Sequence, residues 1–404
     1  MSGVDLIITI VKCVVLLAIL MTAAAYLVLL ERWIAAWVQD RRGPNRVGIP
    51  LTKIKMFGLG QPLADGLKFI FKEEYTPAHV DKFLYTLAPV SILIAALVSF
   101  AVVPFGSMLP PFSIGGEDAV TIDLVIAPDI DVGMIFVFAL SSVAVYGVIL
   151  GGWASNSKYS FLGGLRSSAQ LIAYELPLGL GILGVVLYSG SLRLETIINQ
   201  QAESGTWNIA LQPLGFLVFM VAAFAESARL PFDLPEAEQE LIGGYHTEYA
   251  GMRLLLYLIA EFLHMVTAAF LIVILFFGGW HLWGVTGSGE EPVTWLVALA
   301  RVAILLAKVL GVILFFMMAR WSWPRFRFDQ LMSLAWKVML PLGLVNLVLV
   351  AVLVEYQPRI MAAVGHSLLA LMAAMWAIGI GAWLIVGMLA PLATDNRPRM
   401  SGER

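Results

Sequence analysis

Long apolar runs recur along the whole chain, and they restrict its possible folds more than any other feature. The 404 residues are 60% hydrophobic and only 13% charged. Many runs could cross the roughly 30 Å hydrocarbon layer as helices of about 20 residues, and a soluble core cannot bury so many of them. Because the bilayer interior lacks water, each run must satisfy its own backbone groups, and these lengths fit helices better than barrel strands. The sequence therefore predicts an all-α, polytopic transmembrane helical bundle.

About nine spans are expected, and residues 1–404 are interpreted as a single integral membrane domain. The first span lacks a cationic start and a small-residue cleavage site, so we interpret it as a retained helix rather than a signal peptide. The expected spans lie near residues 5–30, 83–105, 132–151, 167–189, 209–227, 253–280, 295–319, 334–354 and 365–391.

Basic residues gather on alternate loops and so predict an orientation. One side carries most of the lysines and arginines, beginning with the cluster from Arg32 to Lys82, whereas the opposite loops carry only Arg193 and Arg359. Cytoplasmic loops are the ones enriched in basic residues. We therefore expect an outward-facing N-terminus and a cytoplasmic C-terminus.

The residues that redox cofactors require are scarce. The single cysteine, Cys13, lies in an apolar span, which favours a small core residue over a cluster ligand. The five histidines form no pair on one face of a span that could hold a haem. Glu261 and His264 have the spacing of half a di-iron site, but no second such pair occurs. No dinucleotide-binding glycine motif or Walker loop is present. We therefore expect no metal or redox cofactor on this chain, and no nucleic-acid partner.

Acidic residues on and near the spans are the most informative feature for function. An ionised carboxylate at such depth costs several kcal/mol unless it is paired or hydrated, so it marks a candidate functional site. The alternative is a structural ion pair with a nearby arginine, namely Arg32, Arg166, Arg229 or Arg253. Several carboxylates in one half of the bundle, with water between them, favour a proton path instead. The four residues are Glu31, Glu175, Glu226 and Glu261.

Basic residues also occur within the spans. Lys308 lies near the middle of the seventh span and has no partner that the sequence can assign. Lys12 and Arg301 lie closer to the outer face, where long basic side chains can reach the interface.

Two cytoplasmic segments have a distinctive pattern. Residues Gly58–Glu74 predict a short amphipathic helix that lies in the membrane interface and walls a pocket for a lipid-like ligand. Residues Arg229–Met252 are acidic but contain prolines and aromatic residues, which favours a folded loop. The alternative for this loop is a solvated connector.

Four long segments are distinctive as whole motifs. They read QDRRGPNRVG (Gln39–Gly48), QPLADGLKFIFKEE (Gln61–Glu74), GGWASNSKYSFLGGLRSSAQLIAYELP (Gly151–Pro177) and RLPFDLPEAEQELIGGYHTEYAGM (Arg229–Met252). In this order they resemble the H subunit of the proton-pumping NADH:quinone oxidoreductases, the respiratory complex I family. The resemblance extends from about Glu31 to Val354 and is specific because the segments are long and occur in the same order.

The resemblance implies roles for individual residues. It implies that a quinone chamber, formed within about residues 1–354, is lined or shaped by Arg32, Arg42, Arg46, Ala64, Asp65, Lys68, Phe71, Arg229, Phe232 and Asp233. It further implies that Glu236, Glu238, Glu240 and Glu248 link quinone reduction to the pump, and that Glu175, Glu226 and Glu261 lead toward antiporter-like subunits.

Three departures from the family's usual sequence limit how far these residue roles apply to this chain. The family commonly reads ETNR where this chain has Glu226-Ser227-Ala228-Arg229, so the polar contacts of two positions differ. The stretch Ile49–Gly60 is longer and more basic than usual, and the ninth span, about 365–391, occurs only in some relatives. We expect this extra helix to pack against another subunit or lipid.

The resemblance therefore predicts a membrane subunit of a bacterial inner-membrane complex I that reduces ubiquinone or menaquinone. Its expected partners are hydrophilic subunits at the quinone site, small and antiporter-like membrane subunits, and lipids. One alternative is the corresponding subunit of a membrane-bound hydrogenase or another dehydrogenase. A freestanding ion transporter is the other, but it would leave the interfacial helix and the long cytoplasmic motifs unexplained.

Overall fold

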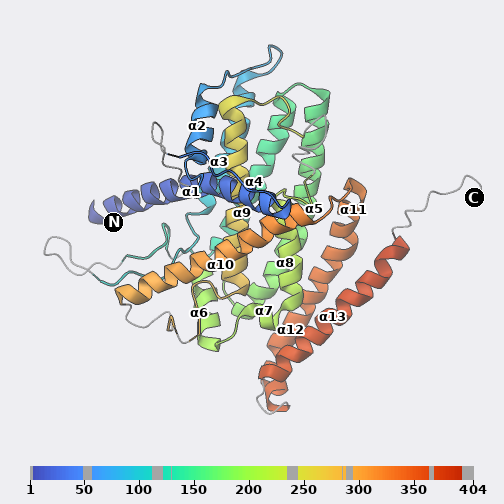
Figure 1. Cartoon of the computed structure of the whole chain (residues 1–404). Coiled ribbons are helices and arrows are strands. Elements are labelled where there is room, and N and C mark those ends of the chain that lie inside the picture. Colours follow the sequence, from blue (N-terminus) through green and yellow to red (C-terminus); the bar gives the residue numbers. More distant parts are fainter. Residues whose placement is uncertain are drawn as a thin grey trace, which may run out of the picture.

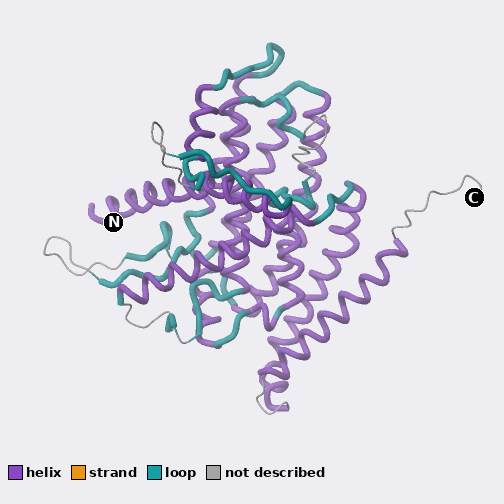
Figure 2. Tube along the Cα trace, viewed as in Figure 1, coloured by secondary structure: helices purple, strands orange, loops and turns teal. Residues whose placement is uncertain are grey.

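Helices joined by loops make up the computed structural model of this chain (Figure 2). The structure describes residues 3–48, 57–111, 122–128, 130–233, 244–283, 285–287, 294–363 and 368–393. Within these ranges, pairing of the β type is limited to an isolated bridge between Met108 and Asp123. The predicted all-α fold is therefore confirmed.

Eight helices in the described residues are long and apolar enough to cross a membrane. Their positions agree with eight of the nine predicted spans, and they identify a multi-pass membrane protein. The eight are α1 (Gly3–Val38), α3 (Lys82–Ser99), α4 (Gly133–Ala154), α5 (Lys158–Ser189), α9 (Gly251–Phe276), α10 (Trp295–Ser322), α12 (Leu340–Ala363) and α13 (Leu368–Ala393).

The expected fifth span, near 209–227, is divided. A four-residue helix, α7 (Asn208–Leu211), precedes α8 (Pro213–Glu226), and Gln212 between them has a non-helical backbone. Pro213 has no N–H group to donate back into the preceding turn, so a new helix begins there. At about 1.5 Å per residue, α8 is shorter than the hydrocarbon layer is thick.

Several boundaries also differ from those expected. Helix α1 continues to Val38, so Glu31 lies inside the helix and not at its end. Helix α5 starts at Lys158, well before the expected residue 167, while α3 already ends at Ser99. The short amphipathic helix is confirmed as α2 (Gln61–Phe71). The remaining elements are α6 (Leu194–Ser204), α11 (Phe328–Ser333) and a π-helical turn, η1 (Leu334–Met339).

Helix α9 forms the centre of the bundle. It is the most deeply buried of the long helices and contacts α3, α10, α8 and α1. Figure 1 shows α3, α4, α5 and α9 running alongside one another, while α1 and α10 cross them at a steep incline. Helices α12 and α13 stand at one edge, where α13 packs on α12, α8 and α7.

Glycines allow the helices to approach closely at the positions that shape the site. A Cβ atom on Gly181 of α5 would lie 3.1 Å from the Cβ atom of Phe219 on α8. From this contact, Glu175 lies six residues back along α5 and Glu226 seven residues forward along α8. Because the two helices run antiparallel, both carboxylates lie at the same end of the bundle.

Candidate functional site

A cavity of about 640 Å³ lies between α1, α2 and α9, and we name it the amphipathic cavity. Apolar side chains such as Met21, Val28, Leu258 and Phe262 form much of its wall. Its charged lining residues are Glu31, Arg32, Arg41, Asp65, Arg229, Glu261 and Arg320. A cavity of this size can enclose a ligand that has both a polar and an apolar part.

A network of ion pairs joins the charged wall of the amphipathic cavity. Arg229 Nη1 lies 3.1 Å from Glu31 Oε2, and Arg229 Nε lies 2.7 Å from Glu261 Oε1. Arg320 Nη1 lies 2.5 Å from the other oxygen of Glu31. The Arg229 guanidinium also lies 4.2 Å from the ring centre of Phe262. Two arginines and two carboxylates therefore balance each other's charge away from water, as buried charges require.

Helix α2 contributes a separate, more exposed pair. Arg32 Nη1 lies 2.6 Å from Asp65 Oδ2, and Gln61 donates to the other oxygen of Asp65 at 3.0 Å. The Arg32 side chain is 46% exposed. Ion pairs in contact with solvent contribute only about 0–1 kcal/mol. This pair therefore places charge at the rim of the cavity more than it stabilises the fold.

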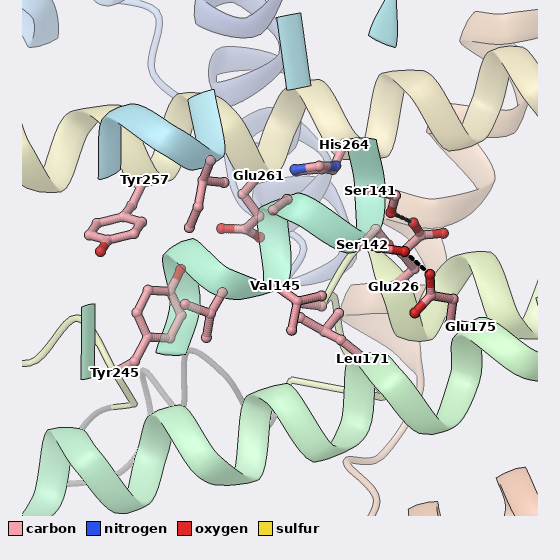
Figure 3. A pocket seen from close by; sticks show the side chains of 15 residues that line it. Ser141, Ser142, Val145, Leu171, Glu175, Glu226, Tyr245, Tyr257, Glu261 and His264 are labelled. Carbon is pink, nitrogen blue, oxygen red and sulfur yellow. Dashed lines mark hydrogen bonds between the residues drawn. The ribbon is translucent and has the colours of Figure 1, made fainter. Parts of the chain in front are cut away.

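A smaller space of about 70 Å³ lies between α4, α5, α8 and α9, and we name it the carboxylate pocket (Figure 3). Glu175, Glu226 and Glu261 line it, together with His264, Tyr245 and Tyr257. The Ser141 hydroxyl donates a hydrogen bond to Glu226, and the Ser142 hydroxyl donates one to Glu175. A space of this volume with carboxylates and hydroxyls in its wall has room for a few water molecules, which could bridge the carboxylates.

The four predicted carboxylates thus divide into two kinds. Glu31 and Glu261 are ion-paired with arginines, as the structural alternative expects, although Arg320 was not among the predicted partners. Glu175 and Glu226 have serine hydroxyls as their partners among the described residues. Glu261 lines both spaces, so the amphipathic cavity and the carboxylate pocket share a wall.

The end of α8 shows how Arg229 reaches this shared wall. Ala228 adopts a left-handed backbone conformation with φ of 53°, which costs a residue with a Cβ about 1–2 kcal/mol. Asparagine tolerates this conformation better, and ETNR places asparagine here. The departure from that motif therefore leaves a strained alanine between two charged residues of the site.

Other predicted residues lie near the cavity without lining it. Phe232 and Asp233 are buried, and the ring centres of Phe232 and Tyr174 lie 5.4 Å apart. Ala64, Lys68 and Phe71 lie on the exposed face of α2, and Arg42 and Arg46 are also exposed. The predictions for Glu236, Glu238 and Glu240 fall outside the described residues.

Glu248 lies beside a cluster of aromatic residues at the edge of the carboxylate pocket. Its backbone carbonyl accepts a hydrogen bond from the Tyr85 hydroxyl at 2.6 Å. The ring of Tyr249 stacks on Tyr85 at 4.1 Å and meets Tyr257 edge to face. Burial raises the pKa of Tyr249 to about 12 and lowers the pKa of His246 to about 4. These loop groups are therefore neutral at physiological pH.

The sequence interpretation missed Ser141, Ser142 and His264 as parts of this pocket. Two adjacent serines inside the apolar α4 were a usable signal, because polar side chains within a span often face other helices. His264 was weighed only as a metal ligand, and it lines the pocket next to Glu261. Among the described residues, no three histidine, cysteine or acidic side chains are placed to hold a metal ion.

Comparisons with known proteins agree on one family. A family model described as NADH dehydrogenase matches residues 11–351. An NADH-quinone oxidoreductase H subunit of Geobacter metallireducens is 46% identical over 343 residues, which cover 85% of this chain and 95% of the relative. The H subunit of Protochlamydia amoebophila is 46% identical over 330 residues, covering 82% of this chain and 92% of the relative. That of Leptospira biflexa is 45% identical over 339 residues, or 83% and 91% of the two chains.

Proposed function

The chain belongs to the NADH dehydrogenase family, and on this premise we propose that it is the quinone-site and coupling subunit of a bacterial complex I. NADH is oxidised on other subunits, where flavin and iron–sulfur clusters carry the electrons. Quinone, either ubiquinone or menaquinone, is the substrate that this chain helps to bind. Its carboxylates then couple the reduction of quinone to the movement of protons.

The observation that carries this proposal is the position of Glu261. Its side chain lines the amphipathic cavity on one side and the carboxylate pocket on the other. A change of charge in the cavity therefore acts directly on a residue of the pocket. In a medium of low dielectric constant, one added charge shifts the protonation of several neighbouring groups together.

The amphipathic cavity suits a quinone because it combines two kinds of surface. An isoprenoid tail can lie along Met21, Val28 and Leu258, while the polar head meets charged groups near Arg229. We further propose that Phe232 and Asp233 shape the chamber from behind this wall. The predicted residues that are exposed then face partner subunits or lipid rather than quinone. They are Arg42, Arg46, Ala64, Lys68 and Phe71.

The carboxylate pocket suits proton transfer because two of its acids, Glu175 and Glu226, have no arginine beside them among the described residues. Glu175 and Glu226 accept hydrogen bonds from neutral serine hydroxyls, so these partners supply no fixed positive charge to hold them ionised. Water in the pocket would complete a path from Glu261 to these residues. Glu236, Glu238, Glu240 and Glu248 remain proposed coupling residues of the cytoplasmic loop.

We propose that the complex lies in the bacterial cytoplasmic membrane, with this chain's N-terminus outside and its C-terminus in the cytoplasm. Hydrophilic subunits with the last iron–sulfur cluster would cover the cytoplasmic side near α2. Small and antiporter-like membrane subunits would continue the proton path. The names and coverage of the relatives favour this function over a hydrogenase subunit or a freestanding transporter.

Purification through a tag on this chain tests the proposal. Extraction in mild detergent should yield several subunits with flavin and iron–sulfur clusters, and NADH:quinone reductase activity that quinone-site inhibitors block. A lone polypeptide, or a nickel hydrogenase in its place, would contradict it.

A further inference from the structure

The C-terminal end of α9 is closed by an unusual turn. Gly278 and Gly279 have φ angles of +70° and +53°, a conformation that favours glycine. The Gly279 N–H group donates to the Val273 carbonyl at 2.9 Å and so closes the helix. A Cβ atom on Gly278 would lie 2.8 Å from the Trp207 ring, and one on Gly279 would lie 2.7 Å from Ile198. The turn is therefore pressed against α6 and Trp207.

Side chains from α6 and α7 donate hydrogen bonds to the last backbone carbonyls of α9. Gln201 Nε2 donates to the Ile274 carbonyl at 2.9 Å, and Asn208 Nδ2 donates to the Leu275 carbonyl at 2.8 Å. The last carbonyls of a helix have no partner within the helix, and each needs one in a buried position. The C-terminal end of α9 thus depends on specific polar side chains.

Lys308 completes this arrangement from α10. Its Nζ atom donates to the carbonyls of Phe277, Gly279 and His281 at 2.8, 2.9 and 2.6 Å. The same atom lies 4.5 Å from the ring centre of Trp207. We name these three carbonyls and the indole ring the ammonium cage.

The geometry of the ammonium cage matches the charged form of lysine. An ammonium group has three N–H donors, one for each carbonyl. A neutral amine has two donors and a lone pair, which would face the third carbonyl oxygen. The indole face and the negative end of the α9 dipole also favour a cation here.

We propose that Lys308 is a positioning residue that stays charged throughout turnover and fastens the C-terminal end of α9. Helix α9 carries Glu261 into the wall between the amphipathic cavity and the carboxylate pocket. When the C-terminal end of α9 is held in place, Glu261 stays at a fixed depth opposite Arg229 while the charges in the amphipathic cavity and the carboxylate pocket change. Lys308 is then a fixed cation and not a carrier of pumped protons. This inference rests on the proposed function.

Chemical rescue tests the inference. The substitution Lys308→Ala removes the atoms of a propylammonium ion and leaves the carbonyls of the ammonium cage in place. We expect NADH:quinone turnover of the variant complex to fall about tenfold, since charge-assisted hydrogen bonds are lost. Added propylamine should restore much of it, and 1-propanol should not. The assay uses detergent-solubilised complex, where amines cannot act by collapsing a proton gradient.

The basicity of the rescuing amine separates a fixed cation from a proton carrier. Propargylamine has the same number of carbons as propylamine but is a weaker base. At equal concentrations of the protonated form, both amines should rescue turnover equally, and the pH profile should match that of the wild type. Rescue that follows amine basicity would overturn the inference. Full activity of Lys308→Ala without amine would also overturn it.

A matched control uses Lys12, a lysine within α1. Among the described residues, its Nζ atom donates to one backbone carbonyl, that of Val125, at 3.2 Å. Lys12→Ala should keep near-normal turnover and show no response to propylamine. If Lys308→Ala prevents assembly, propylamine during expression should restore the assembled complex, and failure to do so would count against the ammonium cage. A wild-type complex without quinone reductase activity would instead refute the proposed function.

Discussion

Arg229 is the residue on which the charge balance of the site most depends. It contacts Glu31 and Glu261, which lie on different helices, and follows a strained alanine at the end of α8. Breaking a buried pair typically costs about 3–5 kcal/mol, because the remaining charge is left without a partner. The two carboxylates next to serines have no such constraint, so function is best tested there.

The substitution Glu175→Gln tests the proton path. Glutamine keeps the size and can still bond to Ser142, but it cannot take up a proton. We expect a normally assembled complex whose NADH:quinone turnover falls about a hundredfold or more, the lower range of effects from removing a proton-transfer group. Turnover and proton pumping are measured in reconstituted vesicles.

Glu203→Gln provides the control for this variant, because Glu203 is exposed near the end of α6 and away from the carboxylate pocket. Its activity should equal that of the wild type. Normal turnover with normal pumping in Glu175→Gln would remove Glu175 from the mechanism.

His246 predicts a pH dependence of stability. Burial lowers its pKa to about 4 in the folded chain, against about 6.5 when unfolded, so protonation favours the unfolded state. Protonation of His246 therefore does not affect the free energy of unfolding above pH 6.5. The destabilisation grows as the pH falls toward 4, where it reaches up to about 3 kcal/mol. His246→Gln should reduce this loss, as measured by the melting temperature of the complex across that pH range. An unchanged acid sensitivity, equal to that of the exposed His79→Gln control, would contradict the prediction.

At the scale of elements, the contact between α3 and α4 supports the carboxylate pocket. Helix α4 carries Ser141 and Ser142. Among the described residues, α3 and α4 form the most extensive contact between any two helices. Gly147 makes this packing possible. Its Cβ atom would lie 2.3 Å from Ile92 Cγ1 and 2.9 Å from the Ala88 carbonyl oxygen.

Gly147→Ala should therefore force α3 and α4 apart. We expect destabilisation of about 1–3 kcal/mol from overpacking, together with reduced turnover as the two serines shift. Thermal unfolding of the purified complex measures the first effect. Gly179→Ala on α5 is a matched control, because nothing lies within 4 Å of its Cβ position and alanine favours a helix. Equal melting temperatures for the two variants would show that the close approach is unimportant.

At the scale of the whole molecule, the site lies among α1–α10, and α13 stands apart from it (Figure 1). The matched family range ends at residue 351, before α13 begins. Leu371 and Met375 of α13 are buried against Leu211 and Leu353. Helix α13 therefore adds apolar contacts to one edge, and none of its described side chains lines either space.

Ending the chain at Ala363 should retain NADH:quinone reductase activity and lower stability. Loss of the contacts that Leu371 and Met375 make with Leu211 and Leu353 should lower stability only modestly, because in the bilayer lipid tails replace them and are equally apolar. Activity per assembled complex and the melting temperature measure the two effects. Met388→Ala, at an exposed position on α13, should change neither. Loss of activity in a fully assembled truncated complex would place α13 in the mechanism.

Much of the fold follows from the sequence alone, because a bilayer allows few solutions to a long apolar run. Length and hydropathy located all eight long helices, and the amphipathic period located α2. The boundaries were less accurate. Helix α1 extends past Glu31, and the break at Gln212 depends on the local effect of Pro213 and on hydrogen bonds with other elements.

The candidate site was only partly accessible from the sequence. Composition and burial cost identified Glu31, Glu175, Glu226 and Glu261 as unusual, since a carboxylate within a span is costly wherever the helix packs. Which of these carboxylates pair with arginines and which meet serines was decided by helix packing. That outcome depends on distances between side chains far apart in the chain, such as Arg229 and Glu31. Lys308 illustrates the same point, because its partners are backbone carbonyls, which every residue carries and no sequence pattern distinguishes.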